Sequence, residues 1–236
     1  MLASTVRALA HRVGFELTRY VPRNFAHLRR VELLRSGRFT LLLDVGADTG
    51  DWAAQARACG FGGRIESFEP RSSAYARLER AAAGDPAWLA HQVALSDRTG
   101  RASMNVSPTG QASSLHELGL QGELEPTHAY IGAEEVELAL LDNVAAVAPN
   151  DVVYLKVDVQ GHELAVLEGA TATLERCAAV ELELSFQPLY AGQALAPELF
   201  ACMDARGFRA AAFEPSWRDR RSGDLLLANA IFLPIN

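Results

Sequence analysis

Short apolar runs alternate with helix-like segments along the chain from Thr40 onward. Residues 41–45 and 152–157 form such runs, and each has the length and the apolar character of a strand that is buried on both faces; residues 64–68 form the second strand. A strand of this kind needs helices on both sides of its sheet. The alternation therefore predicts an α/β fold, in which a mostly parallel sheet carries helices on both faces.

The remaining elements follow from the same patterns. We expect further strands over residues 88–95, 101–106, 136–141 and 179–186, and helices over residues 51–59, 72–83, 161–174 and 197–206. Two final strands, over 208–213 and 225–233, are close enough in sequence to form a hairpin, which places one antiparallel strand at the end of the sheet. Residues 107–135 lack clear periodicity, and so long a stretch inside a compact domain indicates a functional loop or lid.

The first part of the chain differs in charge from the rest. Eight arginines and two glutamates lie in the first 40 positions, whereas the whole chain carries a net charge of −7. This asymmetry marks a boundary near Phe39, so we expect a basic helical extension over residues 1–39 and a single domain over 40–236. Apolar residues at helical spacing predict two helices in the extension, separated at Pro22. These helices either pack on the sheet or present a basic amphipathic surface to anionic lipid.

Composition argues against several classes of protein. A net negative charge is unusual for a general nucleic-acid binder, which presents a basic face to phosphates. The three cysteines form no C-x-x-C pair, so we expect neither a disulfide framework nor a zinc knuckle. No apolar run is long enough to span a membrane, and the first residues lack the pattern of a secretory signal. We therefore expect a cytoplasmic protein without a nucleic-acid partner.

The first strand leads into the turn D-V-G-A-D-T-G, which contains Asp44, Gly46, Asp48 and Gly50. Open α/β sheets bind ligands at the carboxyl ends of their strands, and glycines there let the backbone approach a cofactor closely. The spacing differs from the G-x-G-x-x-G and P-loop patterns. Two carboxylates would repel a pyrophosphate, but they suit a cofactor that carries an amino group and a sulfonium cation. By itself, the turn is equally consistent with a tightly packed loop.

Glu69 ends the second strand, 25 residues after Asp44, and is followed by Pro70. A carboxylate at this position can accept the hydroxyl protons of a ribose. The alternative is an exposed glutamate at a strand end. The spacing from the turn favours the ribose role.

The strand over 152–157 leads into the sequence L-K-V-D-V-Q-G-H-E, whose Lys156 is the only lysine in the chain. Asp158 follows the strand, where a carboxylate can orient an acceptor hydroxyl, take its proton, bind a divalent cation or cap the next helix. His162 acts as a general base only if it reaches the acceptor oxygen, and a lone histidine on a first helical turn is more often solvated. We expect Glu163 to complement the helix dipole or to tie down a loop.

Seven segments in this order carry a family resemblance. They are residues 44–50, 67–70, 93–97, 112–115, 155–163 with 166–170, 181–185 and 188–190. From about Leu41 to Phe232 the chain resembles the FkbM-type S-adenosylmethionine-dependent methyltransferases. The resemblance implies a class I methyltransferase (Rossmann-like) sheet of seven strands, with S-adenosylmethionine as the methyl donor and S-adenosylhomocysteine as the product. It also implies O-methylation of a hydroxyl, often on a sugar, a glycan or a secondary metabolite.

The resemblance also implies which residues bind the donor. The first turn would line its methionine part, Glu69 would bind its ribose, and Ala94 and Ser96 would lie near its adenine. Two serines of the loop after residue 111 would close on the donor, and Asp158 would lie beside the methyl group. The full set of expected cofactor-binding residues is Asp44, Gly46, Ala47, Asp48, Thr49, Gly50, Glu69, Pro70, Ala94, Ser96, Ser113, Ser114 and Asp158.

The candidate catalytic residues are Asp158, His162 and Glu183. Glu183 matches a residue at the end of the next strand, where it contacts substrate or metal or is a structural carboxylate. The chain departs from the family pattern at two positions, with Asp48 where asparagine is usual and Asn229 where an acid is usual. No set of metal ligands is assigned, and a requirement for a divalent cation stays open.

Three functions remain under consideration. The first is an O-methyltransferase that acts on a small-molecule or glycan hydroxyl. The second is a nicotinamide-dependent oxidoreductase on a similar sheet, which the missing third glycine of the phosphate turn disfavours. The third is a catalytically silent subunit that binds the donor. Homo-oligomers are compatible with all three.

Overall fold

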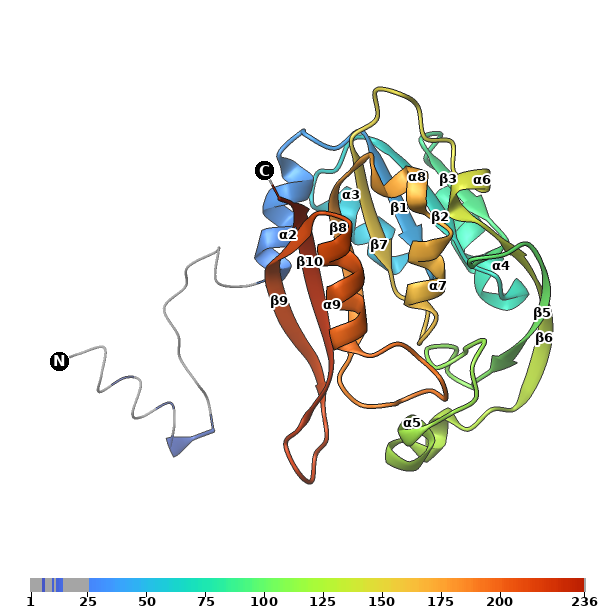
Figure 1. Ribbon diagram of the computed structural model, residues 1–236, viewed down its shortest axis with the longest axis vertical. Coiled ribbons are helices and arrows are strands. Elements are labelled where there is room, and N and C mark those ends of the chain that lie inside the picture. The colour runs from blue at the N-terminus through green and yellow to red at the C-terminus, as the bar shows by residue number, and fades with distance from the viewer. Residues whose placement is uncertain (1–5, 7–9, 11, 15–25, 236) are drawn as a thin grey trace.

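The computed structural model describes residues 6, 10, 12–14 and 26–235. Its centre is a sheet of seven strands with helices on both faces (Figure 1). The strands are β1 (Leu41–Val45), β2 (Arg64–Phe68), β3 (Trp88–His91), β7 (Val153–Val157), β8 (Cys177–Ser185), β9 (Phe208–Arg218) and β10 (Leu225–Pro234). Their order is β3-β2-β1-β7-β8-β10-β9. Strand β10 runs antiparallel to both of its neighbours, and the other adjacent strands pair in parallel. The predicted fold class is confirmed.

Two apolar layers join the helices to the sheet. On one face, α2 (Ala26–Arg35), α3 (Asp51–Ala58) and α4 (Ser72–Ala82) contribute to a core that includes Leu42 and Tyr154 of the sheet. On the other face, α7 (Glu163–Glu168), α8 (Thr171–Leu174) and α9 (Ala196–Ala205) pack against Leu43, Leu155 and Leu182. Successive strand residues point to opposite faces, so the apolar residues of the central strands supply both layers.

A second, smaller sheet lies beyond the carboxyl ends of the central strands (Figure 1). It contains β4 (Ala94–Leu95), β5 (Gly100–Val106) and β6 (Gly132–Ala139), in the order β4-β6-β5. The strand expected over 88–95 is therefore divided. Its first half pairs with β2, whereas Ala94 and Leu95 pair with β6. Both halves are apolar, so the sequence pattern could not separate them.

Two further expectations change in detail. The single helix expected over 161–174 consists of α7 and α8, which are separated at Gly169. A Cβ atom at Gly169 would lie 2.0 Å from the backbone oxygen of Ser96, so the break allows two backbones to approach closely. The C-terminal hairpin forms, but its antiparallel strand β10 lies between β8 and the edge strand β9. The side chains of β10 are more deeply buried than those of β9, which fits this inner place.

The segment expected to form a lid contains α5 (Leu120–Leu124) and a 3₁₀ helix (Pro126–His128). Backbone hydrogen bonds attach it to the loop after β8. Gly119 N–H donates to the carbonyl oxygen of Leu189 at 2.7 Å, and Leu120 N–H donates to that of Pro188 at 3.0 Å. This stretch is therefore fastened to a neighbouring loop.

Helix α2 packs on the sheet. Leu33 and Leu34 are buried in the core, and Arg30 forms an ion pair with buried Glu181, which also accepts a 2.7 Å hydrogen bond from the Tyr154 hydroxyl. The predicted helix break at Pro22 lies outside the described residues. Among the helices of the described residues, none is long and apolar enough to cross a bilayer.

Candidate active site

A cavity of about 650 Å³ opens at the carboxyl ends of β1, β2 and β7. This volume is in the range of small-molecule sites. Its walls contain most of the predicted cofactor residues and all three candidate catalytic residues, namely residues 46–49, Glu69, Pro70, Ala94, Ser113, Asp158, His162 and Glu183. Four other predicted residues lie behind the wall and contact residues that line it. These are Asp44, Gly50, Ser96 and Ser114.

Gly46 brings the first turn against the end of β7. Its φ of 76° is in the left-handed region, and an added Cβ would lie 1.8 Å from the carbonyl oxygen of Asp158. The Asp158 N–H in turn donates to the Val45 oxygen at 3.0 Å. A glycine is required here, because any side chain would push apart the two strand ends that form the floor of the cavity.

Asp48 departs from the family pattern, and the structure explains how the chain accommodates it. Its φ is 46°, a conformation in which asparagine and aspartate are the side chains most often found. Its carboxylate forms a 2.6 Å ion pair with Arg71 Nη2, which offsets the added charge. Arg71 is buried and lines the cavity, but it belongs to no pattern that the sequence could reveal.

Glu69 lies at the tip of β2 and is almost fully buried. Its Oε2 atom accepts the Asp48 N–H at 3.0 Å, and its Oε1 atom accepts the Arg71 N–H at 3.0 Å and lies 3.1 Å from Arg71 Nε. Burial raises the pKa of Glu69, and the Arg71 guanidinium opposes that rise. A carboxylate has about four acceptor positions, so these contacts leave Glu69 able to accept a further hydrogen bond from a ligand.

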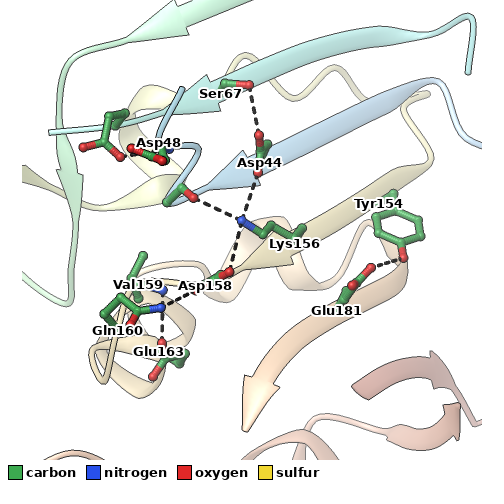
Figure 2. Close-up of polar contacts among 12 residues, drawn as sticks. Asp44, Asp48, Ser67, Tyr154, Lys156, Asp158, Val159, Gln160, Glu163 and Glu181 are labelled. Carbon is green, nitrogen blue, oxygen red and sulfur yellow. Dashed lines mark hydrogen bonds and ion pairs between the residues drawn. The ribbon is translucent and has the colours of Figure 1, made fainter. Parts of the chain in front are cut away.

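Lys156 connects two of the acidic strand tips (Figure 2). Its Nζ atom lies 3.3 Å from Asp44 Oδ1 and 3.6 Å from Asp158 Oδ2, and it donates to the Gly46 carbonyl oxygen at 3.1 Å. Burial favours the neutral amine and lowers the pKa of Lys156. The negative charges of Asp44 and then Asp158 raise this pKa by more, so it lies above its ordinary value. Asp44 is thus a buried counter-ion of Lys156, and Asp158 is the partner that reaches the cavity.

Glu163 is buried and Glu183 is half-buried near Asp158. Burial and the nearby carboxylates of Asp158 and Glu163 raise the pKa of Glu183 well above its ordinary value. Burial raises the pKa of Glu163 to about 7. Its Oε1 accepts hydrogen bonds from the N–H groups of Val159 (Figure 2) and Gly161, and these bonds oppose the rise. Glu163 therefore ties down the loop that follows β7.

His162 lines the cavity, but both of its ring nitrogens have protein partners. Nε2 lies 3.0 Å from Ser96 Oγ, and Nδ1 lies 3.1 Å from Nε2 of His116, whose Nδ1 is 3.0 Å from the Ala191 carbonyl oxygen. Burial, and then His116, lower the pKa of His162 to about 4, so the ring is neutral at pH 7. In this arrangement neither nitrogen is available to an acceptor hydroxyl. The sequence analysis missed His116, which directly follows the block 112–115.

The side of the cavity opposite the first turn comes from α5 and the β9–β10 hairpin. Gln121, Glu125, Trp217 and Leu227 line it. Glu125 and Trp217 also border a second cavity of about 220 Å³, where arginines of the hairpin loop contribute to the wall. Within the described residues, no group of three or more His, Cys, Asp or Glu side chains is placed to hold a metal ion.

A mostly parallel sheet in this strand order, with a glycine turn and a buried glutamate at neighbouring strand tips, defines a class I methyltransferase fold. The chain belongs to the FkbM methyltransferase family, because the model of the methyltransferase FkbM domain matches residues 44–210. Its cofactor is S-adenosylmethionine. None of the curated protein sequences compared with the chain matches it.

Solved structures share the fold. A Listeria monocytogenes protein described as an S-adenosylmethionine-dependent methyltransferase has a TM-score of 0.52 at 6% identity, over 88% of this chain and 97% of its own. A Streptococcus pneumoniae protein assigned as a tRNA (m1A22) methyltransferase, in complex with S-adenosyl-L-methionine, has a TM-score of 0.50 at 14% identity, over 88% and 73%. The ribosomal protein L11 methylase of Lactobacillus delbrueckii subsp. bulgaricus has a TM-score of 0.50 at 11% identity, over 89% and 76%. These likenesses concern the fold alone.

The cavity fits the cofactor in two respects. Gly46 has no side chain at the place where an added Cβ would collide with the Asp158 backbone. Glu69 offers a buried carboxylate at the adjacent strand tip. Phe68, Leu95 and Met104 supply apolar surface to the same wall. This combination suits a ligand with a hydroxylated ribose, an aromatic base and a cationic centre.

Proposed function

We propose that the protein is an O-methyltransferase that methylates a hydroxyl group of a sugar, a glycan or a secondary metabolite. The observation that carries the proposal is the position of Asp158. Its carboxylate lines the cavity beside the first turn and is held there by Lys156. A carboxylate in this place can accept the proton that a hydroxyl group loses on methylation.

The residues divide into a donor end and an acceptor end. Gly46 and its turn would hold the methionine part of the cofactor, Glu69 the ribose, and Ala94 with its apolar neighbours the adenine. When bound, S-adenosylmethionine supplies a methyl group on a sulfonium sulfur and leaves as S-adenosylhomocysteine. Asp158 and Glu183 belong to the acceptor end.

The chain's own contribution is to position the acceptor and remove its proton. Holding the acceptor oxygen about 3–3.5 Å from the methyl carbon supplies much of the acceleration. Asp158 takes the hydroxyl proton late in the transfer, a contribution of typically about 10²–10⁴-fold. Filling of the cavity by donor and acceptor would displace water and so strengthen these polar interactions.

The charge of the cavity supports a neutral hydroxylated acceptor over a nucleic acid. Six acidic side chains line it: Asp48, Asp51, Glu69, Glu125, Asp158 and Glu183. The lysine and arginine residues of the wall are Arg71 and Lys156, and both form ion pairs with these or adjoining carboxylates. A polyphosphate chain would be repelled here, whereas sugar-like hydroxyls can donate to the carboxylates.

Calorimetric titration followed by product analysis tests the proposal. We expect heat on adding S-adenosylmethionine and none on adding NADH. With labelled donor, we expect S-adenosylhomocysteine to form with at least one member of a panel of sugars, glycolipid precursors and polyketides, assayed with and without a chelator. Binding of NADH would support the oxidoreductase instead. Donor binding without transfer to any acceptor would indicate a silent donor-binding subunit.

A further inference from the structure

Gln160 has an unusual backbone conformation beside the cavity. Its φ is 55°, in the left-handed region that side chains other than glycine, asparagine and aspartate seldom adopt. The neighbouring contacts fix this conformation. Glu163 Oε1 accepts the N–H groups on either side of Gln160, and Ser114 Oγ donates to the Gln160 carbonyl oxygen at 2.6 Å. Strain that is held in place by its surroundings is frequent at functional sites.

The side chain of Gln160 has a defined orientation. Its Oε1 atom accepts a 2.7 Å hydrogen bond from the Tyr190 hydroxyl. Its Nε2 atom donates to Asp158 Oδ1 at 2.8 Å and to Glu183 Oε2 at 3.1 Å (Figure 2 shows the bond to Asp158). The reverse orientation would turn the amide oxygen toward two carboxyl groups, so only one arrangement satisfies all three contacts.

One nitrogen atom therefore joins two carboxyl groups that line the cavity. Two carboxyl groups that share one hydrogen-bond donor resist ionising together. Lys156 lies on the Oδ2 side of Asp158, and Glu183 is half-buried among acidic neighbours. The other titratable groups that face the pair are Glu163, Tyr190 and, beyond Tyr190, Tyr130.

We propose that Gln160 is a positioning residue of methyl transfer: its amide, oriented by Tyr190, holds the Asp158 and Glu183 side chains together on the side of the cavity that faces the acceptor. The inference rests on the proposed function, because it assigns Asp158 to the acceptor end. Gln160 does not itself exchange a proton. Its amide bonds to Asp158 Oδ1, so Asp158 Oδ2 makes no bond to the amide. The same amide directs the Glu183 carboxyl group to the same part of the cavity.

The variant Gln160→Gly separates this role from a purely structural one. Glycine adopts φ of 55° without strain, so the variant should fold, yet it removes the amide. We expect thermal stability at least equal to wild type and an affinity for S-adenosylmethionine within twofold. Tyr190→Phe, which removes only the hydroxyl that orients the amide, provides a second variant. Gln187→Ala, at an exposed position outside the cavity, is the control.

The readout is the titration of the Glu183 carboxyl carbon by carbon-13 NMR, assigned by its loss in Glu183→Gln. The hydrogen bond from the amide favours the ionised form of Glu183, so Gln160→Gly should raise the Glu183 titration midpoint by about one pH unit. With an acceptor in hand, the acidic limb of kcat should move in the same direction, and kcat should fall roughly tenfold at neutral pH with little change in the KM for the donor. Tyr190→Phe should give smaller shifts of the same sign.

An unchanged Glu183 titration in Gln160→Gly would overturn the inference, as would a loss of stability without any shift. Failure of the proposed function is a different result. It would appear as wild-type protein that binds no S-adenosylmethionine or releases no S-adenosylhomocysteine, and the NMR titration would still decide whether Gln160 links the two carboxyl groups.

Discussion

Asn229 of β10 lies directly opposite Glu183 of β8 in the antiparallel register of the central sheet. Opposite residues of an antiparallel pair project to the same face of the sheet. Asn229, the position where the resemblance leads us to expect an acid, therefore adjoins the half-buried carboxyl group of Glu183.

Asn229→Asp is expected to raise the pKa of Glu183 further, because a third carboxyl group would join Asp158 and Glu163 around it. A carbon-13 titration of the Glu183 carboxyl group measures the change. The exposed substitution Asn150→Asp, far from the pair in the loop before β7, should leave the titration as in wild type. A lower Glu183 midpoint in Asn229→Asp would contradict the register argument.

Lys156→Met is expected to lower the free energy of unfolding by about 3–5 kcal/mol, because it leaves Asp44 buried without its counter-ion. Urea denaturation at pH 7 measures the loss. Adding Asp44→Asn to this variant should restore about 1 kcal/mol or more, since the uncompensated charge is then removed. Equal stabilities of the single and double variants would show that the ion pair is not the source of the loss.

Gly46→Ala is expected to abolish detectable binding of S-adenosylmethionine and to lower the melting temperature, because the new Cβ would overlap the Asp158 carbonyl oxygen. Gly62→Ala is the matched control: an added Cβ at that position meets nothing within 4 Å. Its stability should change by less than about 0.5 kcal/mol. Normal donor binding by Gly46→Ala would refute the close approach of β1 and β7.

Glu69→Gln is expected to weaken the affinity for S-adenosylmethionine by about 10- to 100-fold, the usual effect of losing a hydrogen bond to a charged acceptor. Isothermal titration calorimetry provides the measurement. The exposed residue Glu79 of α4 offers a control in Glu79→Gln, which should bind the donor as wild type does. An unaltered affinity in Glu69→Gln would remove Glu69 from the donor site.

His162 predicts a dependence of stability on acidic pH. Its pKa of about 4 in the folded protein lies below the ordinary value of 6.5, so the unfolded chain binds more protons between these values. Stability is therefore fully present above about pH 6.5 and declines as the pH falls toward 4, by up to about 3 kcal/mol from this residue. His162→Asn should flatten that part of the curve. Urea titrations at pH 7.0, 5.5 and 4.5 compare the two proteins, and parallel curves would contradict the burial of a neutral ring.

The central strands could be predicted because each is a short, largely buried segment between helix-like segments, and Glu69 because its distance from the first turn is a property of the chain itself. Arg71, His116 and Gln160 could not. The place of each depends on partners that are distant in sequence or on one unusual φ angle. Neither of these features produces a periodic pattern in the sequence. The separation of β3 from β4 was equally hidden, because both segments are apolar and only their pairing partners differ.

Trp217 and Leu227 form part of the cavity wall but follow the last residue that matches the family domain. The half of the cavity that faces the donor turn is thus built from the shared family segment, and the opposite wall includes a hairpin outside it. Exchange of that hairpin between relatives is therefore a route by which substrate preference can diversify while the chemistry stays constant. Chimeras that swap residues 216–227 would be the natural starting point for redirecting this enzyme to new acceptors.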